Sequence, residues 1–141
     1  MIAVDASVAA KWVLPEEYSD QALALIDDAS SNGQPVVAPS FLPIEVTNII
    51  RQQIRREGLT LDEGLDLLDR FLAFPVSLTQ PADLHPRALN LAVQYRLPAV
   101  YDAHYVVLAE ALGAIFWTNN QRLLHAVAGA LPFVRWIVEY A

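Results

Sequence analysis

The fold class is decided near the start of the sequence by residues 2–7, Ile2-Ala3-Val4-Asp5-Ala6-Ser7. A short apolar run that meets an aspartate and then a helix-compatible segment is typical of a buried strand leading into a helix. The same alternation of short apolar runs and longer helical patterns continues along the chain. We therefore predict an α/β fold with a central, mainly parallel sheet of four to five short strands and helices on both faces.

Five short strands are expected, at Ile2–Val4, Val36–Ala38, Val76–Leu78, Ala114–Trp117 and Phe133–Ile137. Apolar residues at helical spacing, with proline and glycine as stops, predict the intervening helices. These are Ala6–Leu14, Ser19–Asp28, Leu42–Glu57, a helix capped by Thr60, Pro86–Tyr95, Asp102–Leu112 and a short helix from Gln121. No repeat or linker interrupts the 141 residues, so we expect a single domain over residues 1–141.

Composition narrows the class of protein. The absence of cysteine excludes a disulfide framework and a thiolate metal site. A net charge of −7 argues against a protein that coats nucleic acid with a basic surface, but it allows a nuclease whose carboxylates bind cations. The N-terminus does not resemble a signal peptide, and no apolar run approaches the roughly 18 residues of a membrane-spanning helix. We expect a cytoplasmic protein without membrane contact.

Polar side chains are expected to gather at one edge of the sheet. Asp5 follows the first strand, and Thr118–Asn120 follows the fourth. Asp102 begins a helix, and Glu45 lies in the first turn of another. In parallel α/β sheets, ligands bind at the carboxyl ends of the strands, so these side chains are candidates for a common site.

Carboxylates gathered in this way need a cation. Like charges within a few ångströms repel and raise one another's pKa, and a bound Mg²⁺ removes that cost. Mg²⁺ prefers oxygen ligands and can activate water for attack on a phosphodiester. We therefore expect Asp5, Glu45 and Asp102 to bind Mg²⁺.

Four segments of the chain together resemble a known family. The sequence resembles the PIN-domain ribonucleases and, more narrowly, the VapC toxins of toxin–antitoxin pairs. The segments are Val4–Ser7, Pro43–Val46, Tyr101–Ala103 followed by Leu108–Glu110, and Trp117–Asn120. The resemblance covers essentially the whole chain. It implies a three-layer α/β sandwich, a homodimer, Mg²⁺ or Mn²⁺ in an acidic pocket and endonucleolytic cleavage of structured RNA such as tRNA or rRNA. It also implies a cognate antitoxin that blocks the pocket and provides any contact with DNA.

The resemblance also assigns roles to residues. It places Asp5, Glu45 and Asp102 as the metal-binding acids, and Ser7 and Thr118 as supporting hydroxyls. The family's fourth acidic position falls at Asn120, where this sequence departs from the pattern. An amide oxygen can still ligate a metal or its water but brings no charge, so we expect one strongly held metal ion rather than two.

Three other interpretations remain open at this stage. Asp5 and Asp102 could simply cap helices, and Glu45 could simply match a helix dipole. Asn120 could mark a binding module that has lost catalysis. A phosphotransfer protein fits less well, because a phosphatase of the haloacid dehalogenase type has a second aspartate at the position of Ser7. A phospho-receiver needs a lysine late in the sheet, and Lys11 is the only lysine in the sequence.

Overall fold

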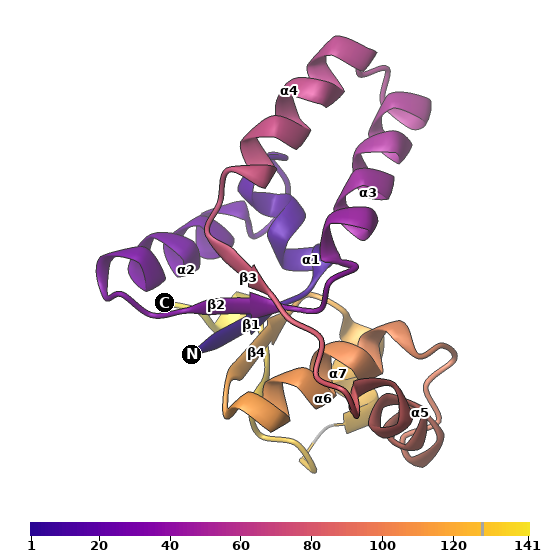
Figure 1. The fold of residues 1–141 in the computed structure, drawn as a ribbon. Helices are drawn as coiled ribbons and strands as arrows, with labels where there is room; N and C mark the ends of the chain where they lie inside the picture. The colour runs from indigo at the N-terminus through magenta and orange to yellow at the C-terminus, as the bar shows by residue number, and fades with distance from the viewer. Residues whose placement is uncertain (128) are drawn as a thin grey trace.

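The centre of the molecule is β1 (Ile2–Val4), a strand whose three residues are all buried. A computed structural model, which describes residues 1–127 and 129–141, places β1 between β2 (Val36–Ala38) and β4 (Ile115–Thr118). Outside these lie β3 (Val76–Leu78) and β5 (Val134–Trp136), so the order is β3-β2-β1-β4-β5. Every pairing is parallel (Figure 1).

Helices cover both faces of this sheet, as Figure 1 shows. The connections that lead from β1 through β2 to β3 contain α1 (Ala6–Ala9), α2 (Ser19–Ser31), α3 (Leu42–Arg56) and α4 (Leu61–Leu72). Those that lead to β4 and β5 contain α5 (Leu84–Gln94), α6 (Tyr101–Leu112) and α7 (Gln121–Val127). Because crossovers between parallel strands are right-handed, connections that run in opposite directions along the sheet lie on opposite faces. The predicted α/β architecture is therefore confirmed.

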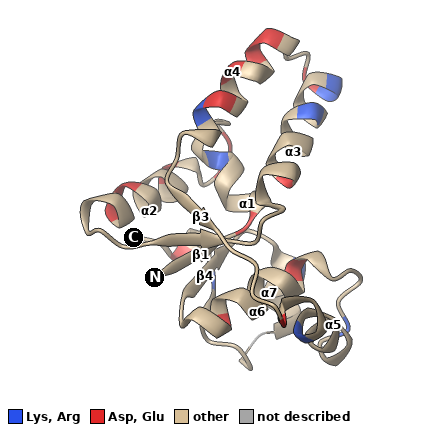
Figure 2. Cartoon of the chain, viewed as in Figure 1, with Lys and Arg blue, Asp and Glu red and all other residues tan. Residues whose placement is uncertain are grey.

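Helices α3 and α4 form a hairpin that projects from the body of the molecule (Figure 1). Gly64 allows their close approach, since a Cβ there would lie 2.9 Å from Ile54 Cδ1. Arginines gather on α3 and acidic residues on α4 (Figure 2). The leucine stripe of α4 is largely exposed, with Leu61 at 65% and Leu72 at 57%. None of the helices that the structure describes is long and apolar enough to cross a membrane.

Element boundaries differ from the prediction in ways that matter for the site. The expected helix over residues 6–14 is α1 followed by a 3-10 turn, η1 (Ala10–Trp12). Helix α5 begins two residues before Pro86, which fits because the first turn of a helix has no intrahelical use for its N–H groups. Strand β4 includes Thr118 rather than ending before it. Strand β5 ends at Trp136 and leads into a second 3-10 turn, η2 (Ile137–Glu139).

Candidate active site

The site lies at the point of the sheet where the order of the strands reverses. From β1 the chain proceeds to β2, and from β4 it proceeds to β5 on the other side, so the carboxyl ends of β1 and β4 border a topological switch point. Val4 pairs with Trp117, which brings the next residues, Asp5 and Thr118, level at that edge. The Thr118 hydroxyl donates to Asp5 Oδ2.

Asp5 is held tightly in this position. The Ser7 hydroxyl donates to Asp5 Oδ1, and the backbone N–H of Val8 donates to the same oxygen at 3.3 Å. Only 4% of the Asp5 surface is exposed. Ser7 also accepts from the Asn119 backbone N–H at 2.9 Å, which ties β4 to the turn after β1.

Glu45 and Asp102 join Asp5 in a single pocket of about 220 Å³. Glu45 comes from the first turn of α3 and Asp102 from the first turn of α6. We call this the acid pocket; its lining residues are Asp5, Ala6, Ser7, Glu45, Ile49, Asp102, Tyr105 and Asn120. The structure thus brings the three acids together with Ser7 and Asn120, two of the three polar neighbours expected from sequence. The third, Thr118, does not line the pocket but donates a hydrogen bond to Asp5.

Tyr105 is a member of the pocket that the sequence did not reveal. Its hydroxyl donates to Glu45 Oε1 at 2.6 Å, while its ring is buried and stacks on Phe116 at 5.9 Å between centroids. Tyr105 lies three residues after Asp102 on α6, so the two share one face of the helix. That spacing is the only sequence signal for its role, since a tyrosine among apolar residues otherwise indicates core packing.

Asn120 is oriented by the helix it precedes. Its side-chain oxygen accepts from the backbone N–H of Leu123 at 3.2 Å and so caps α7, while its Nδ2 donates to Asp102 Oδ2 at 2.9 Å. The amide oxygen, which the sequence offered as a possible ligand for a metal or its water, is therefore already used as an acceptor. The amide nitrogen faces the pocket, because the first turn of α7 takes the oxygen.

Each acid of the pocket has a raised pKa. Burial, opposed by hydrogen bonds from Ser7 and Thr118, raises the pKa of Asp5 to about 6, and the charge of Asp102 adds to the effect. Burial is also the main cause of the raised pKa of Glu45, again with a contribution from Asp102. The pKa of Asp102 is raised by burial and partly lowered by the hydrogen bond from Asn120. Buried carboxylates that influence one another in this way are typical of functional sites.

Comparison with known proteins identifies the family of the chain. The family model of the PIN domain matches residues 2–129. This chain belongs to the PIN-domain family. It is 32% identical over 124 residues to Ribonuclease VapC3 of Pyrobaculum aerophilum, which covers 86% of this chain and 91% of that protein. It is also 32% identical over 123 residues to Ribonuclease VapC12 of Mycobacterium tuberculosis, covering 87% of this chain and 89% of that protein.

The fold comparison points the same way. The crystal structure of PAE2754 from Pyrobaculum aerophilum matches this PIN domain with a TM-score of 0.67 at 19% identity, covering 97% of this chain and 90% of that one. At that identity the likeness concerns the fold alone. The predicted VapC-type PIN domain, with its α/β sandwich, is therefore confirmed.

The acid pocket of this PIN domain has the donor chemistry of a Mg²⁺ or Mn²⁺ site. Among the described residues, no three His, Asp or Glu side chains lie close enough together to hold a metal ion as they stand, and each acid of the pocket accepts a side-chain hydrogen bond. The partners of Glu45 and Asp102 each engage one oxygen, Oε1 and Oδ2, and leave the second oxygen of each carboxylate for another ligand. Hard oxygen donors with room for water are what Mg²⁺ requires, so the residues fit that ion.

Helix capping explains part of the pocket but not all of it. Asp5 caps α1 through the N–H of Val8, and Asn120 caps α7. Asp102 and Glu45 have no such role, since the residues that precede α6 and α3 make no side-chain cap and both acids lie inside their helices. Capping alone therefore does not account for three carboxylates meeting in one pocket of the PIN domain.

Proposed function

We propose that this protein is a divalent-metal-dependent endoribonuclease that acts as the toxin of a toxin–antitoxin pair. The observation that supports it most is the meeting of Asp5, Glu45 and Asp102, from three separate elements, in one pocket at the switch point of the sheet. Two relatives that the chain matches over most of their length are named as ribonucleases, which favours RNA as substrate. Structured RNA such as tRNA or rRNA is the proposed substrate class.

Each residue of the pocket has a proposed task. Asp5, Glu45 and Asp102 hold Mg²⁺, or Mn²⁺ in its place, while Ser7 and Thr118 keep Asp5 in position through their hydrogen bonds. A bound divalent cation supplies positive charge that stabilises the transition state of phosphodiester cleavage and lowers the pKa of water. Asn120 orients Asp102 and brings no charge of its own, so the protein retains one cation strongly.

A cognate antitoxin is the proposed protein partner. Next to the acid pocket lies a second pocket of about 340 Å³ that shares Ala6, Glu45 and Ile49 with it. Its rim carries two exposed apolar side chains, Ile44 at 71% and Tyr101 at 60%. An apolar rim beside acidic groups suits a protein segment that covers the site. We also propose that the protein is a homodimer, which sedimentation equilibrium would test. Any contact with DNA is proposed to occur through the antitoxin.

The test is cleavage of a pool of tRNA and rRNA by purified protein with Mg²⁺, with Mn²⁺ or with EDTA. Discrete fragments are expected with either metal and none with EDTA. Asp5→Asn and Asp102→Asn should each lower the rate at least about 100-fold, because a removed charge weakens cation binding and transition-state stabilisation.

The matched control is Asp69→Asn, which removes the same charge from an exposed site on α4 and should leave cleavage unchanged. Circular dichroism verifies that all variants fold. If folded wild-type protein cleaves nothing under any metal, the nuclease proposal fails and a catalytically silent binding module, marked by Asn120, takes its place. If Asp102→Asn cuts at the normal rate, the assignment of the site fails.

A further inference from the structure

A further pocket, separate from the two described above, opens between α7 and β5. This α7–β5 pocket has a volume of about 380 Å³ and is lined by Gln121, Leu124, His125, Val134, Arg135, Trp136 and Glu139. Its size lies within the roughly 300 to 1,000 Å³ typical of sites for small organic groups. None of these residues belongs to the acid pocket.

Strand register places the α7–β5 pocket beside the acid pocket. Thr118 pairs with Trp136 across β4 and β5. On the other side of β4, Trp117 pairs with Val4 of β1, so Thr118 lies level with Asp5. Asp5, Thr118 and Trp136 therefore follow one another along the carboxyl edge, and two strand spacings amount to about 10 Å. Gln121 of the α7–β5 pocket directly follows Asn120 of the acid pocket.

The orientation of the Trp136 ring is fixed by its neighbours. Its indole Nε1–H donates to Asn119 Oδ1 at 3.1 Å, and the ring of Tyr18 meets it edge-on at 6.2 Å between centroids. The indole is only partly buried, so part of its surface remains open to the pocket. An aromatic ring with a fixed orientation is the usual platform on which proteins stack a base of single-stranded RNA.

Polar groups complete the lining. Gln121 and His125 are exposed on α7 and can both donate and accept hydrogen bonds, as the edge of a base or a ribose hydroxyl requires. Arg135 forms an ion pair with Glu139 at 3.8 Å, and its guanidinium lies 4.9 Å from the centre of the Trp117 ring. Both side chains of the pair are exposed, so water screens their attraction and Arg135 can turn toward a phosphate, while Glu139 can accept from a base amine or a 2′-hydroxyl.

We propose that the α7–β5 pocket binds one nucleoside of the RNA substrate, next to the phosphate that is cleaved in the acid pocket. The proposal extends the nuclease function proposed above. Only the statement that the bound RNA is a substrate rests on that function. Binding of a nucleotide in the pocket can nevertheless be measured without any cleavage.

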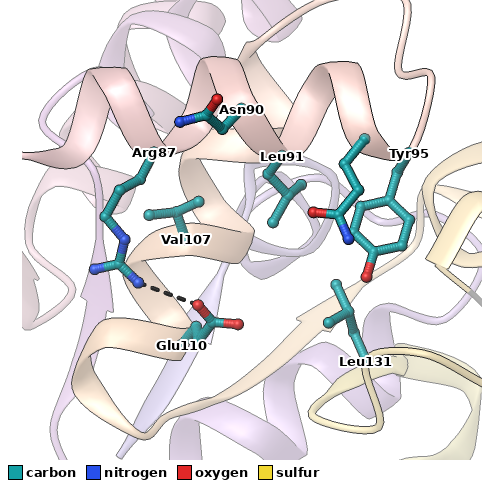
Figure 3. Close-up of a pocket in the computed structure, with 8 residues that line it drawn as sticks. Arg87, Asn90, Leu91, Tyr95, Val107, Glu110 and Leu131 are labelled. Atoms are coloured by element: carbon teal, nitrogen blue, oxygen red, sulfur yellow. Dashed lines mark hydrogen bonds and ion pairs between the residues drawn. The ribbon is translucent and has the colours of Figure 1, made fainter.

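A pocket on another part of the molecule provides a control. It lies between α5 and α6, has a volume of about 290 Å³ and includes Gln94 in its lining. Figure 3 shows Arg87, Asn90 and Tyr95 around it. There Arg87 is held by a hydrogen-bonded ion pair with Glu110 at 3.1 Å and lies 3.7 Å from Asp83. The aromatic residue of this pocket is Tyr95, and none of its described lining residues is a tryptophan.

The first experiment is NMR of the tryptophan indole N–H groups of the full chain in EDTA, titrated with each of the four nucleoside 5′-monophosphates or with inorganic phosphate. Trp136→Phe assigns the Trp136 signal, and buried Trp12, bonded to the Ala22 carbonyl, is the internal reference. We expect a saturable shift of the Trp136 signal with at least one nucleotide, no shift of Trp12 and no effect of phosphate alone. An unmoved Trp136 signal, or the same shift with phosphate alone, overturns the proposal.

The second experiment uses two double variants that each remove two exposed polar side chains. Gln121→Ala/His125→Ala should weaken nucleotide binding about tenfold and raise KM for RNA several-fold with little change in kcat. Asn90→Ala/Gln94→Ala, in the α5–α6 pocket, should change neither. Equal effects of the two variants overturn the proposal. Absence of cleavage by the wild-type protein would defeat the proposed function, while the NMR result in EDTA would still decide the nucleotide site.

Discussion

Replacing Asn120 with aspartate tests how the acid pocket balances its charges. The change exchanges one side-chain nitrogen for an oxygen and keeps the oxygen that caps α7 through Leu123. The hydrogen bond of 2.9 Å from Asn120 Nδ2 to Asp102 Oδ2 is lost, and two carboxylates then face each other. The metal-free protein should therefore become less stable, whereas the protein with bound cations should not.

The expected loss of stability of the metal-free variant follows from the distance between the two carboxylates. Two unit charges about 4 Å apart repel by about 4 kcal/mol at an effective dielectric constant of about 20. Rotation of the half-buried side chains and solvent screening reduce this to about 1–2 kcal/mol, since partly exposed charges interact weakly. For a chain of this size we expect the melting temperature in EDTA to fall by about 3–8 °C.

The assay is thermal unfolding, followed by circular dichroism, in EDTA and in a series of Mn²⁺ concentrations. A ligand at about 100 times its Kd stabilises the folded state by about 2.7 kcal/mol, so tighter binding appears as a larger rise in melting temperature. The variant should gain more from Mn²⁺ than the wild type does. Calorimetry should show either tighter binding or a second bound ion.

The matched control is Asn119→Asp, which adds the same charge one residue earlier. The Asn119 side-chain oxygen accepts from Trp136 Nε1 at 3.1 Å, and an aspartate keeps that bond. If both variants lose the same stability in EDTA and gain the same from Mn²⁺, the charge at position 120 has no special relation to Asp102. The proposed reason for a single strongly held cation would then be wrong.

Three further outcomes concern the groups around Asp5 and Glu45. Burial raises the pKa of Asp5 to about 6. Because an unfolded aspartate has a pKa of about 3.9, the metal-free protein should lose about 3 kcal/mol of stability as the pH rises from about 4 through 6. Urea unfolding in EDTA should show a larger loss for the wild type than for Asp5→Asn, in which only Glu45 and Asp102 of the pocket keep raised pKa values; equal profiles would contradict it. Thr118→Val removes a donor to Asp5 and should weaken Mn²⁺ binding about tenfold in calorimetry, and unchanged affinity would count against it. Tyr105→Phe should lower Mn²⁺ affinity and cleavage about tenfold, whereas Tyr95→Phe, at the residue directly after α5, should lower neither.

Much of the fold could be predicted because its signals are local. The apolar run at Ile2–Val4 and the other short runs separate strands from helices without knowledge of the tertiary structure. The rule that ligands gather at carboxyl ends then placed Asp5, Glu45 and Asp102 at one edge. The leucine stripe of α4 predicted a helix correctly, yet its exposure depends on what the stripe packs against, which periodicity does not contain.

The parts of the site that could not be predicted depend on contacts between distant elements. Tyr105 gained its role from a hydrogen bond to Glu45, 60 residues earlier in the chain. The orientation of Asn120 depends on the first turn of α7 and on Asp102, 18 residues away. The α7–β5 pocket depends on the register between β4 and β5, and each of its residues alone is ordinary for a surface helix or a short strand.

The hydrogen bonds of the acid pocket explain how this protein can fold without a bound cation. Every carboxylate in the pocket carries a penalty from burial, which appears as its raised pKa. Ser7, Thr118, Tyr105 and Asn120 each donate to one of these carboxylates and offset part of that penalty without adding charge. An aspartate at position 120 would instead add to the penalty. The amide therefore favours the metal-free fold, and the same lack of charge is the reason for proposing that one cation is held strongly rather than two.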